Sequence, residues 1–252
     1  MLGHVVASFF REAGLQVVTT DARYAAEPQN PLVRAVLDSE AEWVINAIGK
    51  IKQKTSQPAE LLEANALLPA QLKVFLRPGQ RLLHASTDCV FSGKTGNYAR
   101  DQARDAEDVY GLSKVLGEAV AERDHCQVIR TSIIGPELNT ASGLMAWFLS
   151  QKTQVKGFTD HLWNGITTLE WSKIALEIVR GNLHPAAPIL QPAAAQPVSK
   201  YELLKMISEI WNHPIAITPV ASGAPINRTL LPDLPRADIR QQLAELQAWY
   251  RV

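Results

Sequence analysis

The chain has 252 residues, 25 basic and 25 acidic side chains, and 46% hydrophobic residues. This length allows one or two domains with a buried core, and the hydrophobic content excludes a largely disordered chain. A formal net charge of zero argues against a protein held to nucleic acid or to an anionic membrane by its overall field, and two cysteines are too few for a disulfide scaffold or a four-thiolate metal site.

Helix and strand patterns alternate along the first half of the chain. Apolar residues at helical spacing predict helices at residues 3–13, 32–40, 58–76 and 107–123. Short apolar or β-branched runs predict buried strands at residues 15–20, 43–48, 81–87 and 126–132. Because short strands that alternate with helices indicate βαβ units, the predicted fold class is α/β with a parallel sheet.

After Gly135 the loops become longer and richer in proline. Further helices are expected at residues 171–180, 199–211 and 239–250. We expect residues 1–134 to form the sheet domain and residues 135–252 to form a smaller cap that partly returns to the sheet. No apolar run approaches the roughly 18 to 20 residues that cross a bilayer, and the first residues lack the basic leader of a secretory signal. The expected compartment is therefore the cytoplasm, where both cysteines would stay reduced.

Small polar side chains gather where the strand over residues 81–87 ends. Ser86, Thr87 and Asp88 follow a buried apolar run within the segment HASTDCVFSG. In a parallel sheet this point lies at the carboxyl edge, where ligands bind. The segment therefore predicts a ligand site.

A tyrosine and a lysine follow on the next predicted helix. Tyr110 and Lys114 are four residues apart and share one helix face. An ammonium beside a phenol stabilises the phenolate, which would lower a pKa that starts near 10 and make Tyr110 a general acid near neutral pH. The chain contains a second copy of the spacing, Tyr201 and Lys205. We interpret that copy as a structural helix face, because no hydroxyl-bearing strand end stands before it.

STDCVFSG followed by YGLSKVLGE resembles the extended short-chain dehydrogenase/reductase superfamily, and within it the dTDP-4-dehydrorhamnose reductase group. The likeness continues in WVINAIG at residues 43–49, in Asn65 and in RTSIIG at residues 130–135, and it covers nearly the whole chain. It implies a Rossmann-type doubly wound parallel sheet with a small C-terminal α/β substrate-binding cap.

The resemblance implies catalysis by Thr87, Tyr110 and Lys114. A nicotinamide cofactor, NADP or NAD, would exchange hydride with a carbon of a nucleotide-linked sugar, while Tyr110 would donate a proton to the carbonyl oxygen. Lys114 would lower the tyrosine pKa and bind the nicotinamide ribose, and Thr87 would hydrogen-bond the reacting oxygen. Asp88 is followed by Cys89 rather than by the glutamate of the related sugar dehydratases, which argues against a dehydratase.

Binding residues are also implied by the resemblance. The cofactor contacts would be Leu2, Gly3, Asp21, Arg23, Asn46, Ala47, Ile48, Gly49, Asn65, Ser86, Tyr110, Lys114 and Ile133. The substrate contacts would be Thr87, Asp88, Asn164, Thr167 and Arg228. Asp21 would favour NAD by accepting hydrogen bonds from an adenosine ribose, whereas Arg23 would favour NADP by holding a 2′-phosphate, and this choice stays open. No metal site is expected, because the histidines lack the spacing of metal ligands.

The start of the sequence departs from the family pattern. The family opens with a strand and a Gly-x-x-Gly-x-x-Gly turn, and Met1-Leu2-Gly3 resembles only the last third of that turn. The missing strand would leave a gap in the sheet with unpaired backbone groups. Either the true protein begins upstream, which we favour, or a shortened chain binds dinucleotide poorly or not at all.

Three hypotheses for function follow. The first is an NAD(P)-dependent reductase of a nucleotide-linked 4-keto sugar for surface polysaccharide synthesis. The second is a sugar-nucleotide epimerase of the same superfamily, in which the cofactor stays bound. The third is a non-catalytic regulatory or binding subunit with a defective cofactor site. The expected partner is a nucleotide sugar, without nucleic acid or membrane, and the resemblance allows a homodimer.

Overall fold

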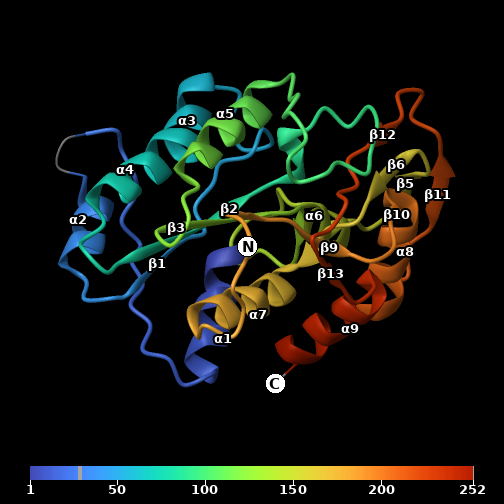
Figure 1. Cartoon of the computed structure of the whole chain (residues 1–252). Coiled ribbons are helices and arrows are strands. Elements are labelled where there is room, and N and C mark those ends of the chain that lie inside the picture. The colour runs from blue at the N-terminus through green and yellow to red at the C-terminus, as the bar shows by residue number, and fades with distance from the viewer. Residues whose placement is uncertain (28–29, 252) are drawn as a thin grey trace.

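A four-stranded parallel sheet lies at the centre of the computed structural model, which describes residues 1–27 and 30–251 (Figure 1). The strand order is β1-β2-β3-β8. The strands are β1 (Trp43–Asn46), β2 (Arg81–Ser86), β3 (Cys126–Arg130) and β8 (Ile189–Leu190). Asn46 lies opposite His84, and Ser86 lies opposite Arg130, so the carboxyl ends of three strands meet at one edge. The α/β fold class with a Rossmann-like parallel sheet is confirmed.

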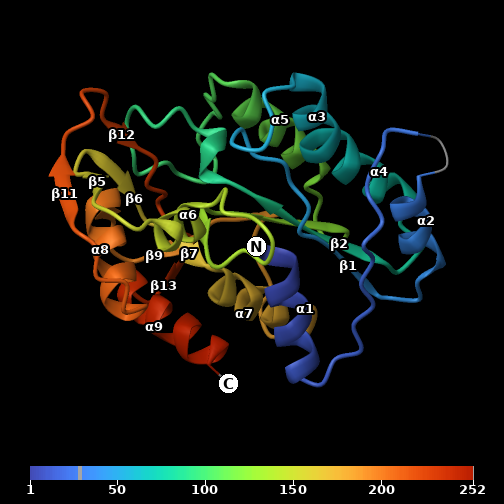
Figure 2. The ribbon, with the colours of Figure 1, turned by 180° about the vertical axis from the view of Figure 1, so that it is seen from behind.

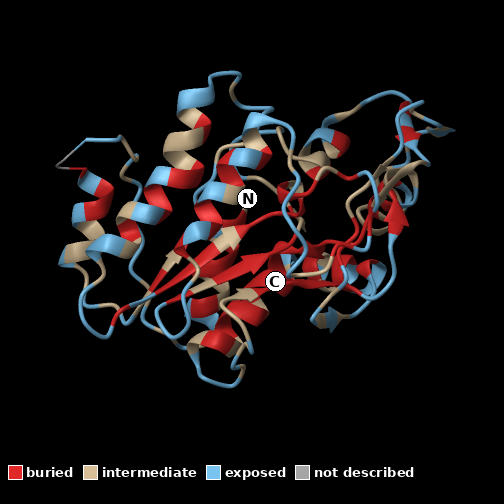
Figure 3. Cartoon of the chain, turned by 45° about the horizontal axis from the view of Figure 1, so that its top comes forward, coloured by how far each residue is buried: buried red, intermediate tan, exposed pale blue. Residues whose placement is uncertain are grey.

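Helices cover both faces of this sheet (Figures 1 and 2). They are α1 (Leu2–Glu12) and α7 (Thr168–Val179) on one face, and α2 (Pro31–Asp38), α3 (Pro58–Leu62), α4 (Leu68–Phe75) and α5 (Val109–Gly117) on the other. Because successive strand residues point to opposite faces, Leu83 packs in a cluster with Phe10 and Trp171, and Leu82 packs in a cluster with Leu72. The sheet is therefore buried between two apolar layers (Figure 3).

The strand predicted at residues 15–20 is wrong. This segment has no strand pairing, and the Val18 side chain is 71% exposed. In the described part of the chain β1 pairs with β2 alone, so it forms the edge of the sheet. A β-branched run becomes a strand only when a neighbour pairs with its N–H and C=O groups, and the described residues supply none.

The helix predicted at residues 58–76 is present, but it contains a π-helical turn, η1 (Glu63–Leu67), between α3 and α4. Pro69 has no N–H to bond with the carbonyl four residues before it, which belongs to Asn65, and a π turn accommodates this break. The Asn65 carbonyl oxygen points at Gly117 on α5, where an added Cβ would lie 2.1 Å from it. Gly117 therefore allows the two helices to approach with backbone against backbone.

The remaining predicted helices and strands are present with shifted ends, and the helix expected at residues 107–123 is realised as α5 followed by the 3₁₀ turn η3 (Glu118–Val120). The C-terminal helices are α6 (Leu144–Ser150), α7, α8 (Lys200–Ile210) and α9 (Ile239–Tyr250). The small strands are β4 (Ile133–Ile134), β5 (Val155–Phe158), β6 (His161–Trp163), β7 (Ile166–Thr167), β9 (Pro192–Ala194), β10 (Val198–Ser199), β11 (Ile217–Val220), β12 (Ile226–Asn227) and β13 (Leu234–Arg236).

The C-terminal part has a second core of its own, in which Phe148, Trp163, Leu203 and Leu243 pack together. Its small sheets have the orders β10-β6-β12, β11-β5, β13-β9 and β4-β7. β8 leaves this part and joins the central sheet beside β3. A boundary near residue 134 stays a prediction. Among the helices of the described residues, none has the length and apolar character needed to cross a membrane.

Candidate active site

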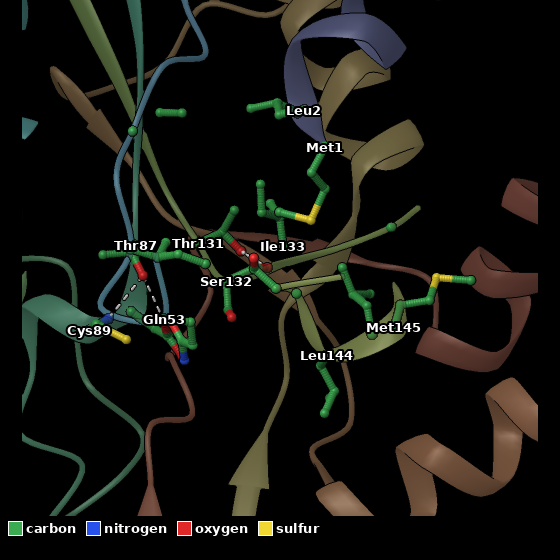
Figure 4. A pocket seen from close by; sticks show the side chains of 18 of the residues that line it. Met1, Leu2, Gln53, Thr87, Cys89, Thr131, Ser132, Ile133, Leu144 and Met145 are labelled. Atoms are coloured by element: carbon green, nitrogen blue, oxygen red, sulfur yellow. Dashed lines mark hydrogen bonds between the residues drawn. The ribbon is translucent and has the colours of Figure 1, made fainter. Parts of the chain in front are cut away.

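A cavity of about 350 Å³ opens at the carboxyl edge of the sheet. Its wall is built by the ends of β1 and β2, the start of α1, the first turns of α5 and the segment between β3 and α6. Figure 4 shows Thr87 and Cys89 on one side of it and Met1, Ile133 and Met145 on the other. This is the place that the polar end of the strand over residues 81–87 predicted for a ligand site.

Thr87 stands at the end of β2, where the strand turns into the 3₁₀ turn η2 (Asp88–Val90). Its hydroxyl donates to the Asp88 carboxylate over 3.0 Å and accepts from the Cys89 backbone N–H over 3.2 Å. Only 8% of the residue is exposed. Both hydrogen bonds hold the Thr87 hydroxyl at the cavity wall.

Tyr110 and Lys114 reach the same cavity from α5. The Asp108 side chain caps this helix by accepting from the Gly111 N–H over 2.7 Å. A Cβ on Gly111 would lie 2.4 Å from the Cys89 carbonyl oxygen, so the absent side chain lets α5 begin directly against the end of β2. The Lys114 ammonium donates to the Ala85 carbonyl over 3.2 Å. The predicted trio of Thr87, Tyr110 and Lys114 is thus brought to one cavity.

Burial controls the titration of this site. It lowers the pKa of Lys114 to about 8, against the opposing effect of Glu118. It also raises the pKa of Tyr110 well above its ordinary value, and the neighbouring Cys89 adds to this rise. Desolvation penalises the phenolate more than the surroundings stabilise it. The net shift of the Tyr110 pKa is therefore upward, and Tyr110 holds its proton at neutral pH. That Lys114 lowers this pKa stays a prediction.

Cys89 lies in the cavity wall beside the trio and was not among the predicted site residues. It lines the cavity, and burial raises the pKa of its thiol to about 12. A thiol with that pKa carries almost no thiolate at neutral pH, and the thiolate is the nucleophilic form. Cys89 therefore shapes the wall as a neutral side chain.

Asn65 connects α5 to the loop that follows β1. Its amide donates to the Ser113 hydroxyl over 3.0 Å and to the Lys50 carbonyl over 2.9 Å, and it accepts from the Lys50 N–H over 3.0 Å. A Cβ on Gly49 would lie 3.1 Å from the Lys114 ammonium nitrogen. The loop therefore lies directly over Lys114.

Beneath the trio, a buried ion pair supports the strand ends. Arg130 donates to both carboxylate oxygens of Glu118 over 2.7 Å, and less than 2% of either side chain is exposed. Ser86 donates to the same carboxylate over 2.6 Å, and Arg104 donates over 3.0 Å. This network joins the residue before Thr87 to the end of α5.

His84 and Asn46 form a second buried contact, in which the Asn46 amide donates to His84 Nδ1 over 3.1 Å. That bond places the imidazole proton on Nε2, which has no partner among the described residues. Burial lowers the pKa of His84 well below its ordinary value, and Lys114 adds to this effect. The imidazole is therefore neutral and structural.

The predicted cofactor contacts divide into two groups. Those that line the cavity are Leu2, Ala47, Ile48, Gly49, Ser86, Tyr110, Lys114 and Ile133. Those that do not are Gly3, Asp21, Arg23, Asn46 and Asn65. Asp21 and Arg23 are exposed, on the segment that follows the unpaired residues 15–20. Asn46 and Asn65 are buried beneath the wall.

The predicted substrate contacts also divide. Thr87 and Asp88 line the cavity. The Asn164 amide instead bonds to the Leu230 backbone over 2.8 and 2.9 Å, and the Thr167 hydroxyl caps α7. Arg228 donates to two backbone carbonyls of residues 91 and 92. The substrate roles of these last three residues stay predictions.

Several lining residues were not predicted, and they come from segments far apart in the sequence. They include Gln53, Lys54, Cys89, Thr131, Ser132, Glu137, Leu144, Met145, Trp163, Lys200 and Leu203. One signal was present for Lys200: Ser199 and Glu202 have the spacing of a capping box, which marks the start of a helix. A residue directly after such a cap lies at a helix end, where it can face a cavity.

The nicotinamide and ribose half of a dinucleotide fits this cavity. The Lys114 ammonium makes one hydrogen bond to the described residues, so two of its three donors are open to ribose hydroxyls. Gly49 and Ile133 offer backbone and an apolar surface beside it. Asp21 and Arg23, the residues predicted to hold the adenosine half, lie outside the cavity.

Comparisons with known proteins agree with this arrangement. Residues 1–249 match the family model of the RmlD substrate binding domain. The chain belongs to that family. No curated protein matches it. This family match confirms the resemblance to the dTDP-4-dehydrorhamnose reductase group.

Solved structures similar to this family member share its fold. A dTDP-4-dehydrorhamnose reductase of Clostridium acetobutylicum has a TM-score of 0.79 at 17% identity, over 100% of this chain and 96% of that one. The Bacillus anthracis enzyme, in complex with NADP, has a TM-score of 0.74 at 16% identity, over 88% of this chain and 84% of that one. MoeE5, in complex with UDP-glucuronic acid and NAD, has a TM-score of 0.74 at 17% identity, over 99% of this chain and 95% of that one.

Proposed function

We propose that this chain is an NAD(P)-dependent reductase that acts on a nucleotide-linked 4-keto sugar. The coarser part, an oxidoreductase of sugar nucleotides, is supported by the family and by similar structures that hold NADP or NAD. The finer part is carried by one observation. Thr87, Tyr110 and Lys114, from a strand end and a helix, line one cavity at the carboxyl edge of the sheet.

Each member of the trio has a task that its surroundings support. Tyr110 is protonated at neutral pH and would donate that proton to the carbonyl oxygen of the sugar. The Thr87 hydroxyl hydrogen-bonds the same oxygen and positions it. Lys114, Gly49 and Ile133 would hold the nicotinamide ribose, and the bound nicotinamide supplies the hydride.

The choice between NAD and NADP would be made at the adenosine end by one of two exposed residues, and it stays open. Asp21 would select NAD by accepting hydrogen bonds from the ribose, and Arg23 would select NADP by pairing with a 2′-phosphate. The reduced sugar nucleotide would serve surface polysaccharide synthesis in the cytoplasm. A homodimer is compatible with this role.

The test is a turnover assay of the full chain with NADH or NADPH and a dTDP-linked 4-keto-6-deoxy sugar. Net oxidation of the cofactor with formation of a 4-hydroxy sugar is the expected result. An inverted stereocentre in the product, without net oxidation of the cofactor, would indicate an epimerase rather than a reductase. Failure of a folded chain to quench or enhance NADPH and NADH fluorescence would favour the non-catalytic subunit instead.

A further inference from the structure

Lys200 faces the catalytic cavity from the C-terminal part of the molecule. It is the first residue of α8, directly after the Ser199 cap. It lines the same cavity as Thr87 and Tyr110, together with Trp163. The cavity thus has a cationic side chain that comes from the C-terminal part of the molecule, outside the trio.

In the part of the chain that the structure describes, the Lys200 ammonium has neither an ion pair nor a hydrogen bond. The ammonium lies over the face of the Trp163 ring in a cation–π contact, with the nitrogen 5.1 Å from the ring centroid. A cation over an indole is stabilised by the ring but keeps all three N–H donors free. Such a group is open to a ligand.

The charges around Lys200 leave a positive excess. Burial lowers the pKa of Lys200 most strongly, Asp88 raises it, and Arg228 lowers it. Cys89 nearby is a neutral thiol. Two cations therefore stand against one carboxylate, and that carboxylate already accepts from the Thr87 hydroxyl.

Of these two cations, Lys200 is the one that lines the cavity. Arg228 donates to the carbonyls of Phe91 and Ser92. Lys200 lines the cavity together with Asp88 and Cys89, which directly follow Thr87 in the sequence. The ammonium thus lines the part of the cavity where the sugar carbonyl would lie.

We propose that Lys200 binds a carboxylate carried by the sugar, so that the substrate class is a nucleotide-linked acidic sugar. This inference rests on the proposed function, which places the sugar beside Thr87. A carboxylate on the sugar ring matches the positive charge and the free N–H donors of the Lys200 ammonium. The diphosphate of the nucleotide offers the same anionic oxygens, and the experiment below separates the two.

The test measures binding by calorimetry to the full chain and to Lys200→Met, which keeps the length of the side chain and removes the charge. The ligands are glucose and glucuronate, each linked to UDP or to dTDP, together with free UDP and dTDP. The wild type is expected to bind the glucuronate form about 10- to 100-fold more tightly than the glucose form, as a charge-assisted hydrogen bond implies. Lys200→Met should lose this preference and bind the glucose form unchanged.

Lys205→Met is the matched control, because Lys205 lies on the same helix but is exposed. It should keep the preference for glucuronate. Equal binding of glucose and glucuronate by the wild type would overturn the inference and leave the proposed function in place. An equal loss of affinity by Lys200→Met for free diphosphate and both sugars would also overturn it, by assigning Lys200 to the diphosphate. Absence of binding for every ligand would also overturn the inference, whereas the proposed function is decided separately by the turnover assay with the 4-keto sugar.

Discussion

Tyr110 and Lys114 on α5, and Tyr201 and Lys205 on α8, share one spacing but lie in different surroundings. The Lys114 ammonium is buried and donates to the end of β2. The Lys205 side chain is exposed, and its ammonium lies 5.7 Å from the centroid of the Tyr201 ring. Spacing puts two groups on one helix face, whereas the strand end that the helix meets decides whether they form a site.

The largest expected difference between the two pairs is in turnover. Tyr110→Phe removes the proton donor and should lower kcat by about 10²- to 10⁴-fold, the usual range for a positioned acid. Tyr201→Phe, the matched change on α8, should leave kcat within about twofold, because Tyr201 is outside the cavity. The measurement is steady-state oxidation of the reduced cofactor. Equal losses in both variants would contradict the assignment of Tyr110.

The second difference is in how each helix is supported. Glu118→Gln leaves the buried charge of Arg130 without its partner, and it should lower the free energy of unfolding by about 3–5 kcal/mol. Glu202→Gln changes only the cap of α8 and should cost about 1 kcal/mol or less. Urea unfolding followed by circular dichroism compares the two. A cost for Glu118→Gln no greater than for Glu202→Gln would show that the ion pair does not support α5.

The smallest expected difference is in the pH dependence of stability. The pKa of Lys114 is about 8 in the folded protein and about 10.4 in an unfolded chain. Between these values the unfolded chain binds more protons, so the free energy of unfolding rises as pH increases from about 8 to about 10. Lys114→Met should therefore exceed the wild type in stability by up to about 3 kcal/mol at pH 7 and lose that advantage near pH 10.

The control for this prediction is Lys205→Met, whose exposed side chain should leave the wild-type pH curve unchanged. The measurement is a series of urea titrations from pH 7 to pH 10. Parallel curves for wild type and Lys114→Met would show that burial of the ammonium carries no penalty.

Much of the fold was predictable because the signals are local. The helical spacing of apolar residues indicated α1 and α9 within one or two residues at each end. The polar cluster after β2 and the pair on α5 also indicated the carboxyl-edge site. These patterns depend on neighbours within one or two turns of the chain, which a sequence displays directly.

The errors arose where distant residues decide the outcome. Residues 15–20 have a strand-like composition, yet no described strand pairs with them. The pKa of Tyr110 depends on how deeply α5 packs against Cys89, which spacing does not reveal. Trp163 on β6 and Lys200 on α8 line the cavity only through the packing of the C-terminal part beside the carboxyl edge of the sheet. Both residues stand more than 70 positions after Thr87 in the sequence.

The contact between the Asn65 carbonyl and Gly117 has a consequence for how this protein can change. Backbone atoms set the distance between the π turn and α5, so the exposed side chains of either helix can be exchanged without moving Lys114. Even a methyl group at position 117 would lie 2.1 Å from the Asn65 carbonyl oxygen, so the backbone of one helix would have to shift. Redesign of the pocket for another sugar therefore leaves the position of Lys114 unchanged as long as Pro69 and Gly117 are kept.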